Sequence, residues 1–207
     1  TDLARGRVVL FGGYDTGLLA ETWEWDGTTW IQRTPAVSPS ARAGCAMAYD
    51  PRRNRVVLFG GGSLNDTWEW DGNNWTRLSP PVSPPARGGH GLAYDPAGQR
   101  ILLYGGAFNQ SYQIRYNDTW TWDGLTWRQV FPAEYPVNSF PSAELIAYHV
   151  RNRVLLPLAG VPGNAWEWDG VTWTERKLPT MPAGRMGSRA AYDHDGLAII
   201  MFGGLSG

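Results

Sequence analysis

The chain has 207 residues, with 18 basic and 19 acidic side chains and a formal net charge of −1. This balance gives no electrostatic reason to expect a nucleic-acid or anionic-membrane partner, and 43% hydrophobic residues argue against disorder. The single cysteine excludes an intrachain disulfide framework and a cysteine-rich zinc site. No segment is apolar over the length that a membrane span requires.

The sequence is built from a repeat. All 12 tryptophans fall in four copies of W-x-W-D-G-x-x-W, at residues 23–30, 68–75, 120–127 and 166–173. A short apolar run that ends in glycine occurs five times, at Val8–Gly13, Val56–Gly61, Ile101–Gly106, Val154–Gly160 and Ile199–Gly204. A stretch that ends in Ala-Tyr occurs four times, at Gly44–Tyr49, Gly89–Tyr94, Ala143–Tyr148 and Gly187–Tyr192. Such regular spacing is typical of a repeat architecture.

Each repeat predicts four strands, named a to d in chain order. The Ala-Tyr stretch is strand a, and the apolar run is strand b, which is too short for a helix. Strand c carries two tryptophans spaced two residues apart, and hence on one face of the strand. Asp-Gly then signals a tight turn into strand d. No helical periodicity of useful length occurs, so the predicted fold class is all-β.

Four-stranded antiparallel sheets repeated at this interval predict a β-propeller, whose sheets are called blades. Blades pack face to face, and tryptophan supplies large apolar surfaces for that contact. We therefore predict that the tryptophans serve blade packing and that none of the twelve is spare for a ligand site. The glycine pair after strand b is expected to let the chain turn sharply.

The glycine pair after an apolar strand, the tyrosine and the tryptophan that opens the outer strand resemble the Kelch repeat in its Trp-rich bacterial form. The resemblance covers essentially the whole chain and implies a single Kelch-type propeller domain over residues 1–207. It also implies export, because Trp-rich bacterial Kelch chains are often exported. WD-repeat propellers fit less well, since a Gly-His pair occurs only at Gly89-His90.

The strand count predicts four full repeats and an extra strand b, which is a partial fifth repeat. A four-bladed ring can close by joining strand a at 187–193 to the strands at 7–33, but the last strand b is then surplus. We favour the alternative, in which the chain is part of a longer propeller or is completed by another chain. Open blade edges would then allow self-association.

In such blades the b–c loops and d–a connections share one face, where propeller function usually lies. The third repeat is irregular there: its long b–c loop, Ala107–Asn117, and its d–a connection predict ligand-binding residues at Phe108, Tyr112, Arg115, Tyr116 and Tyr135. Aromatic and arginine side chains dominate binding hot spots. The alternative interpretation is that these side chains only pack the loops against the rim.

An arginine precedes strand a in three repeats, at Arg42, Arg87 and Arg185. The Kelch resemblance implies that these arginines lie on the ligand face near the central opening, as a ring able to hold carboxylates in bidentate fashion. Salt bridges between blades are the alternative.

A further register predicts residues that line the central channel: Cys45, His90, Glu144 and Ser188, with Arg189 beside them. Converging polar groups can form a ligand site. A solvated wall without chemistry is the favoured alternative. Neither a metal nor a cofactor is predicted.

The sequence therefore favours a binding module that presents its b–c and d–a loops to a protein or peptide partner. A carbohydrate-binding, lectin-like propeller is the second hypothesis. The third is an enzyme at the channel mouth around His90, Glu144 and Arg189, which we favour less because no catalytic constellation is evident in the sequence.

Overall fold

The computed structural model describes residues 1–108, 114–136, 146–148, 153–157, 164–177, 185–186, 189–193, 198–202 and 205–206. Within these residues the regular secondary structure is entirely β-strand, and all strand pairs are antiparallel. The prediction of an all-β chain is confirmed. The described part of the chain contains no helix long and apolar enough to cross a membrane.

Three sheets have four strands in the order a, b, c, d. Sheet 2 contains β4 (Ala46–Asp50), β5 (Arg55–Gly61), β6 (Leu64–Trp70) and β7 (Trp75–Leu78). Sheet 3 contains β8 (Gly91–Asp95), β9 (Arg100–Tyr104), β12 (Thr119–Trp122) and β13 (Trp127–Val130). Sheet 4 contains β14 (Ile146–Tyr148), β15 (Arg153–Pro157), β16 (Asn164–Trp168) and β17 (Trp173–Lys177).

The sheets at the two ends have fewer described strands. Sheet 1 holds strands b, c and d, which are β1 (Val8–Tyr14), β2 (Leu18–Trp25) and β3 (Trp30–Arg33). Sheet 5 holds strands a and b, which are β19 (Arg189–Asp193) and β20 (Ala198–Phe202). Two short ribbons pair β10 (Ala107–Phe108) with β11 (Ile114–Arg115), and β18 (Arg185–Met186) with β21 (Leu205–Ser206).

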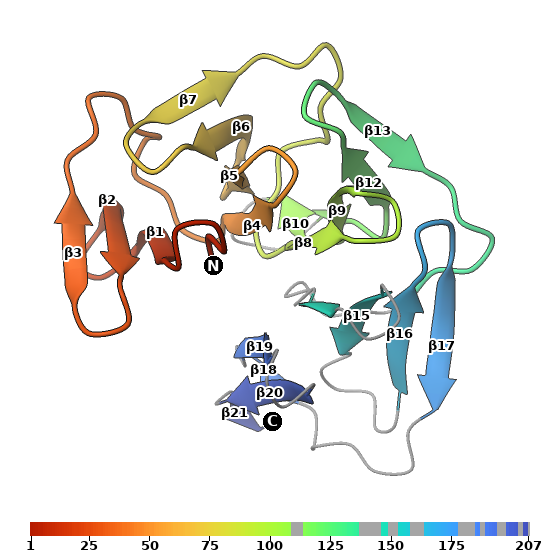
Figure 1. The fold of residues 1–207 in the computed structure, drawn as a ribbon. Coiled ribbons are helices and arrows are strands. Elements are labelled where there is room, and N and C mark those ends of the chain that lie inside the picture. The colour runs from red at the N-terminus through yellow and green to blue at the C-terminus, as the bar shows by residue number, and fades with distance from the viewer. Residues whose placement is uncertain are drawn as a thin grey trace.

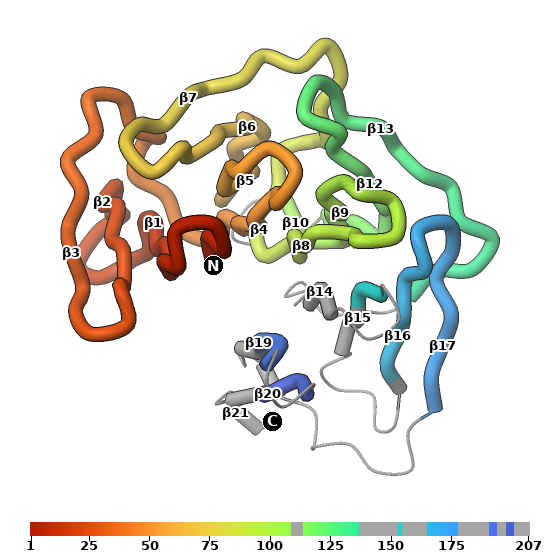
Figure 2. Tube along the Cα trace, viewed as in Figure 1, coloured from red at the N-terminus to blue at the C-terminus, as the bar shows by residue number. Residues whose placement is uncertain are grey.

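The sheets follow one another around an arc in chain order, from β1–β3 at one end to β19–β20 at the other (Figure 1). Strands a lie on the inner side of the arc, where β4 contacts β8, β8 contacts β14 and β14 contacts β19. The d strands β3, β7, β13 and β17 lie on the outer side (Figure 2). The arrangement is β-propeller-like, and it places the b–c loops and d–a connections at one end of the sheets.

The third tryptophan of the second, third and fourth motifs holds its sheet against the preceding one. These three tryptophans are fully buried, and each indole N–H donates to a threonine hydroxyl of the preceding sheet: Trp75 to Thr22 at 2.9 Å, Trp127 to Thr67 at 2.9 Å and Trp173 to Thr119 at 3.0 Å. An aromatic ring of that same preceding sheet meets each indole edge to face: Phe11 on Trp75, Phe59 on Trp127 and Tyr104 on Trp173, with centroids 5.1 to 5.3 Å apart. The contact is therefore repeated three times with the same geometry.

The second tryptophan adds a buried polar contact between sheets 1 and 2. The Trp70 indole donates to Glu24 Oε1 at 2.9 Å, and Arg5 and Arg33 donate to the same carboxylate. Burial alone would raise the pKa of Glu24, but these three donors together hold it below its usual value. The carboxylate therefore stays charged although its side chain is fully buried.

The glycine pair after strand b lets the chain turn, and it also lets the segment that enters the next sheet approach closely. Gly12 and Gly60 have φ of +66° and +61°, a region that favours glycine. A Cβ atom at Gly60 would lie 2.7 Å from the Arg87 carbonyl oxygen, in the segment that enters the next sheet. The adjacent Gly61 N–H donates to that carbonyl at 2.9 Å. Neighbouring sheets are thus joined main chain to main chain at this end.

Nine of the 12 tryptophans are buried, and the other three are those of the first motif. Trp23 and Trp25 are half-buried, and Trp30 is 46% exposed, whereas its counterpart Trp75 is 2% exposed. The expectation that all twelve pack between sheets is therefore met by the later motifs but not by Trp30.

Replacing Thr67 by Val should leave the buried Trp127 N–H without an acceptor and lower the free energy of unfolding by about 1–3 kcal/mol. Thr67→Ser keeps the hydroxyl and should retain most of that stability. Urea unfolding followed by tryptophan fluorescence measures both variants. Equal stability of Thr67→Val and Thr67→Ser would contradict the role of this hydrogen bond.

Candidate ligand-binding site

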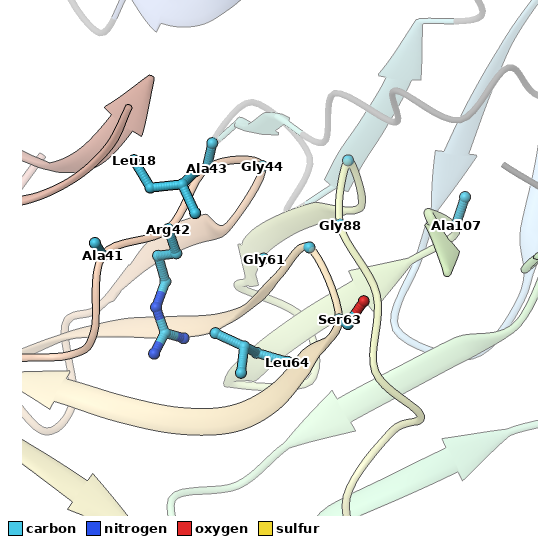
Figure 3. A pocket seen from close by; sticks show the side chains of 12 residues that line it. Leu18, Ala41, Arg42, Ala43, Gly44, Gly61, Ser63, Leu64, Gly88 and Ala107 are labelled. Atoms are coloured by element: carbon cyan, nitrogen blue, oxygen red, sulfur yellow. The ribbon is translucent and has the colours of Figure 1, made fainter. Parts of the chain in front are cut away.

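A cavity of about 450 Å³ opens where the b–c loops and d–a connections of sheets 1 to 3 meet (Figure 3). The d–a connection into sheet 2 contributes residues 41–44, and the connection into sheet 3 contributes residues 88 and 89. The b–c loop of sheet 2, with the last residue of β5 and the first of β6, contributes residues 61–64, and Leu18 and Ala107 complete the lining. The cavity is therefore built by three consecutive repeats at the face that the sequence predicts for function.

The lining is mostly main chain and small side chains. Glycine and alanine supply eight of its twelve residues: Ala41, Ala43, Gly44, Gly61, Gly62, Gly88, Gly89 and Ala107. Leu18 and Leu64 add apolar surface, and Ser63 adds a hydroxyl. A wall of this kind offers peptide N–H and C=O groups and shallow apolar contacts to a ligand.

Sequence reasoning missed this lining, because glycine and alanine carry no chemical signal of their own. The available signal was the repetition itself: Ala41-Arg-Ala-Gly44 and Ala86-Arg-Gly-Gly89 enter successive strands a, and three consecutive glycines follow β5 Phe59. Small residues at equivalent positions of neighbouring repeats indicate that main chains approach closely there.

Arg42 and Arg87 have a structural role that differs from the predicted ring. Arg42 is 2% exposed and makes a bidentate pair with Asp66, at 2.6 and 2.9 Å, and a hydrogen bond to the Gly60 carbonyl. Arg87 is fully buried and makes the equivalent pair with Asp118, at 2.5 and 2.9 Å. Each pair ties the segment that enters strand a to the start of strand c.

These two guanidinium groups are thus occupied by carboxylates, so they are not presented to a ligand as the ring would require. The main chain of each arginine hydrogen-bonds to the preceding sheet, Arg42 with Leu19 and Arg87 with Leu64, while its side chain pairs with a carboxylate at strand c of the next sheet. The pairs therefore act between neighbouring sheets, as the alternative interpretation expects. The carboxylates also accept the indole N–H of the first tryptophan, Trp68 on Asp66 and Trp120 on Asp118, both at 2.7 Å. The side chain of Arg185 lies outside the described part of the chain.

The predicted residues of the third repeat are only partly brought together. The Tyr116 ring stacks on the Arg87 guanidinium, 4.0 Å from the ring centroid. Phe108 is half-buried in β10, and Arg115 is exposed in β11, beside the Ala107 edge of the cavity. Tyr112 lies outside the described residues.

Tyr135 lies elsewhere, on a separate cavity of about 140 Å³ next to Phe131, Asn117, Asp118 and Gln129. It is 47% exposed and Phe131 is 82% exposed. The described ligand-binding residues predicted in the third repeat are therefore divided between two separate places.

Of the predicted channel residues, His90 is buried rather than on a solvated wall. Its ring meets Phe59 edge to face with centroids 5.4 Å apart, and neither ring nitrogen has a well-aligned hydrogen bond among the described residues. Burial, and then the nearby Arg87 charge, lower the pKa of His90 to about 3, although the Phe59 backbone opposes this. The imidazole is thus neutral at physiological pH.

Of the other predicted channel positions, the structure describes the side chain of Cys45. Cys45 is half-buried, and burial raises the pKa of its thiol, which disfavours the nucleophilic thiolate. Glu144, Ser188 and the side chain of Arg189 lie outside the described residues. Among the residues that the structure does describe, no group of three or more His, Cys, Asp or Glu side chains could hold a metal ion.

Comparisons with known proteins show similarity at the level of the fold. No protein-family model matches the chain, and no curated protein matches its sequence. The solved structures include 135 matching chains, among them the structure of YjhT, with a TM-score of 0.65 at 15% sequence identity. That match covers 94% of this chain and 71% of YjhT. The chain and YjhT therefore share a fold.

Removing the Arg87 guanidinium should cost about 3–5 kcal/mol of stability, because Asp118 would be left partly buried without its counter-charge. Arg87→Ala measured by urea unfolding tests this, with Arg115→Ala as the matched control on an exposed arginine, expected within about 0.5 kcal/mol of the parent. If Arg87→Ala is as stable as Arg115→Ala, the buried pair does not stabilise the sheet.

Acid should destabilise the chain through His90. In the unfolded chain this imidazole takes up a proton near its ordinary pKa of 6.5, whereas the folded chain resists protonation down to about pH 3. Stability is therefore fully present above pH 6.5 and falls as the pH drops, by about 2 kcal/mol between pH 7 and 5 from this residue. The His90→Leu variant should lose that part of the pH dependence in urea unfolding at the two pH values. An unchanged pH dependence would show that His90 titrates normally.

Proposed function

We propose that the chain is a binding module of the Kelch propeller type, and that it binds a protein or peptide segment in the cavity between the b–c and d–a loops. The observation that carries this proposal is the position and lining of the cavity: it lies at the loop face of three successive repeats and is walled by main chain and small side chains.

The lining favours a peptide over a small charged ligand. Peptide recognition commonly combines main-chain hydrogen bonds with pockets for alternate side chains. The cavity offers main chain along residues 61–63 and 43–44, flanked by the apolar Leu18 and Leu64. The one charged side chain in the lining, Arg42, is already paired with Asp66. Specificity would come from Phe108 and Arg115 on the neighbouring ribbon.

A carbohydrate is the second candidate ligand, at the separate cavity beside Tyr135. Exposed aromatic rings stand there next to the planar polar groups of Asn117, Gln129 and Asp118. This combination of an apolar face with a few polar groups suits a sugar ring. The enzyme hypothesis has no supporting observation among the described residues.

Filling the cavity should abolish peptide binding without unfolding the chain. Peptides selected from a random-sequence display library on the parent protein should bind Ser63→Trp at least about tenfold more weakly, a loss of about 1.4 kcal/mol or more. Ser63 is exposed, so the melting temperature should be unchanged. Isothermal titration calorimetry with one selected peptide measures the affinity.

Asn73→Trp is the matched control, because Asn73 is exposed on the c–d turn at the opposite end of the same sheet. It should bind the selected peptide like the parent. Selection of no peptide, or equal affinity of the parent and Ser63→Trp, would count against the cavity as a peptide site. A glycan array on the parent and on Tyr135→Ala tests the second candidate.

A further inference from the structure

The β10–β11 ribbon beside the cavity carries an arginine whose charge is available to a ligand. The two buried arginines at the cavity each hold a carboxylate, Arg42 that of Asp66 and Arg87 that of Asp118. Arg115 is exposed in β11, and it forms no ion pair with a carboxylate among the described residues. It therefore differs from its neighbours in being both exposed and unpaired within that part of the chain.

The strand register places Arg115 on the side of the ribbon that meets the cavity. Ala107 and Arg115 are direct partners in the antiparallel pair, and Phe108 and Ile114 are the next partners. Directly opposed side chains lie on the same face of an antiparallel pair, and successive residues alternate between faces. Ala107 is 2% exposed and lines the cavity (Figure 3). Arg115 thus shares the face of a lining residue, and Phe108 and Ile114 lie on the other face.

Main-chain hydrogen bonds attach the ribbon to the wall of the cavity. Gly88 and Ala107 each donate to the carbonyl oxygen of the other at 2.9 Å, and both residues line the cavity. At the other end of the ribbon, the Tyr116 N–H donates to the Gly106 carbonyl oxygen at 2.9 Å. The base of the ribbon is therefore held to the wall, and Arg115 stands directly before the residue that closes it.

The Tyr116 side chain adds an anchor at the end of β11. Its ring lies over the Arg87 guanidinium, 4.0 Å from the ring centroid. Two residues further on, Asp118 accepts two hydrogen bonds from the same guanidinium. A cation–π contact is stronger where the cation is desolvated, and Arg87 is fully buried. The end of the ribbon is thus fixed to one buried cation from two sides.

Sheet 2 shows why the longer loop needs this anchor. The position two residues before the paired aspartate holds Leu64 in sheet 2 and Tyr116 in sheet 3. Leu64 pairs with Gly61 across a two-residue turn, so the short loop is fixed by its own strands. The b–c connection of sheet 3 is longer, and the Tyr116 ring supplies a contact outside the loop. We therefore expect Tyr116 to fix the position of its neighbour Arg115.

We propose that Arg115 is a specificity-determining residue that binds a carboxylate of the peptide, and that Tyr116 is the positioning residue that holds Arg115 at the cavity. This role rests on the peptide binding proposed above. The lining of the cavity contains no acidic side chain, so no carboxylate of the wall competes for Arg115. The planar guanidinium suits bidentate binding of a carboxylate. Aspartate and glutamate side chains and the C-terminus of a peptide all supply this group.

Calorimetry on peptides selected from the random-sequence library tests the role of Arg115. The acidic residue of a selected peptide is replaced by its amide, and in a second form the C-terminus is amidated, which identifies the source of the carboxylate. Removing that carboxylate should weaken binding to the parent about threefold or more. Arg115→Ala should bind the charged and neutral forms equally. Arg77→Ala, on an exposed position of the outer strand β7, is the matched control and should discriminate like the parent.

Two variants of Tyr116 test the positioning role. Tyr116→Leu installs the residue type of sheet 2 and removes the aromatic face over Arg87. It should lose the preference for the charged peptide but still bind the neutral form, whereas a merely structural role would weaken both forms equally. Tyr116→Phe keeps the ring and should retain the preference of the parent.

Equal affinity of the parent for the charged and neutral forms, or an Arg115→Ala variant that still discriminates, would overturn the role of Arg115. Equal weakening of both forms by Tyr116→Leu would overturn the role of Tyr116. Selection of no peptide, or unchanged binding by Ser63→Trp, would overturn the proposed function and the role of Arg115 with it. Binding that is sensitive to Ser63→Trp but independent of the carboxylate would overturn the role of Arg115 alone.

Discussion

The structure depends on one contact, in which the third tryptophan of the second, third and fourth motifs inserts its indole into the preceding sheet. A buried indole must find an acceptor for its N–H, and the threonine directly before the first tryptophan of the preceding motif supplies it: Thr22 for Trp75, Thr67 for Trp127 and Thr119 for Trp173. The hydrogen bond sets the depth of the ring, and the aromatic edge contact sets its tilt. Sheets 2 and 3 supply both an indole and a threonine acceptor, so the same contact recurs at three successive junctions along the arc.

That spacing creates the candidate site. Once neighbouring sheets are held at a fixed distance, the segment entering each strand a must pass over the glycines of the sheet before it, where a Cβ atom would collide with the Arg42 or Arg87 carbonyl. The buried pairs of Arg42 with Asp66 and of Arg87 with Asp118 then hold these segments to strand c. What remains between the segments is a cavity walled by main chain, so the same contacts that stabilise the sheets also determine what the loop face can bind.

The strands, their order and the packing role of the later tryptophans could be predicted from the sequence, because the spacings that specify them are local and repeated. The carboxylate partners of Arg42 and Arg87 and the burial of His90 could not. Asp66 and Asp118 follow their arginines by 24 and 31 residues, and only the folded sheet brings them together. His90 looked like a channel residue because its register is polar in other repeats, but the adjoining Phe59 covers it. The exposure of Trp30 depends on whether another sheet covers it, which its own motif does not specify.

Hydrogen exchange of the tryptophan indole protons, followed by NMR, tests the central contact most directly. The indole protons of Trp75, Trp127 and Trp173 are hydrogen-bonded and buried between sheets, so they should exchange only as slowly as the sheets separate. The Trp30 side chain is 46% exposed, so its indole proton should exchange rapidly. Uniformly fast exchange of all four would contradict this role, because the repeated indole-to-threonine contact would then not be what holds neighbouring sheets together.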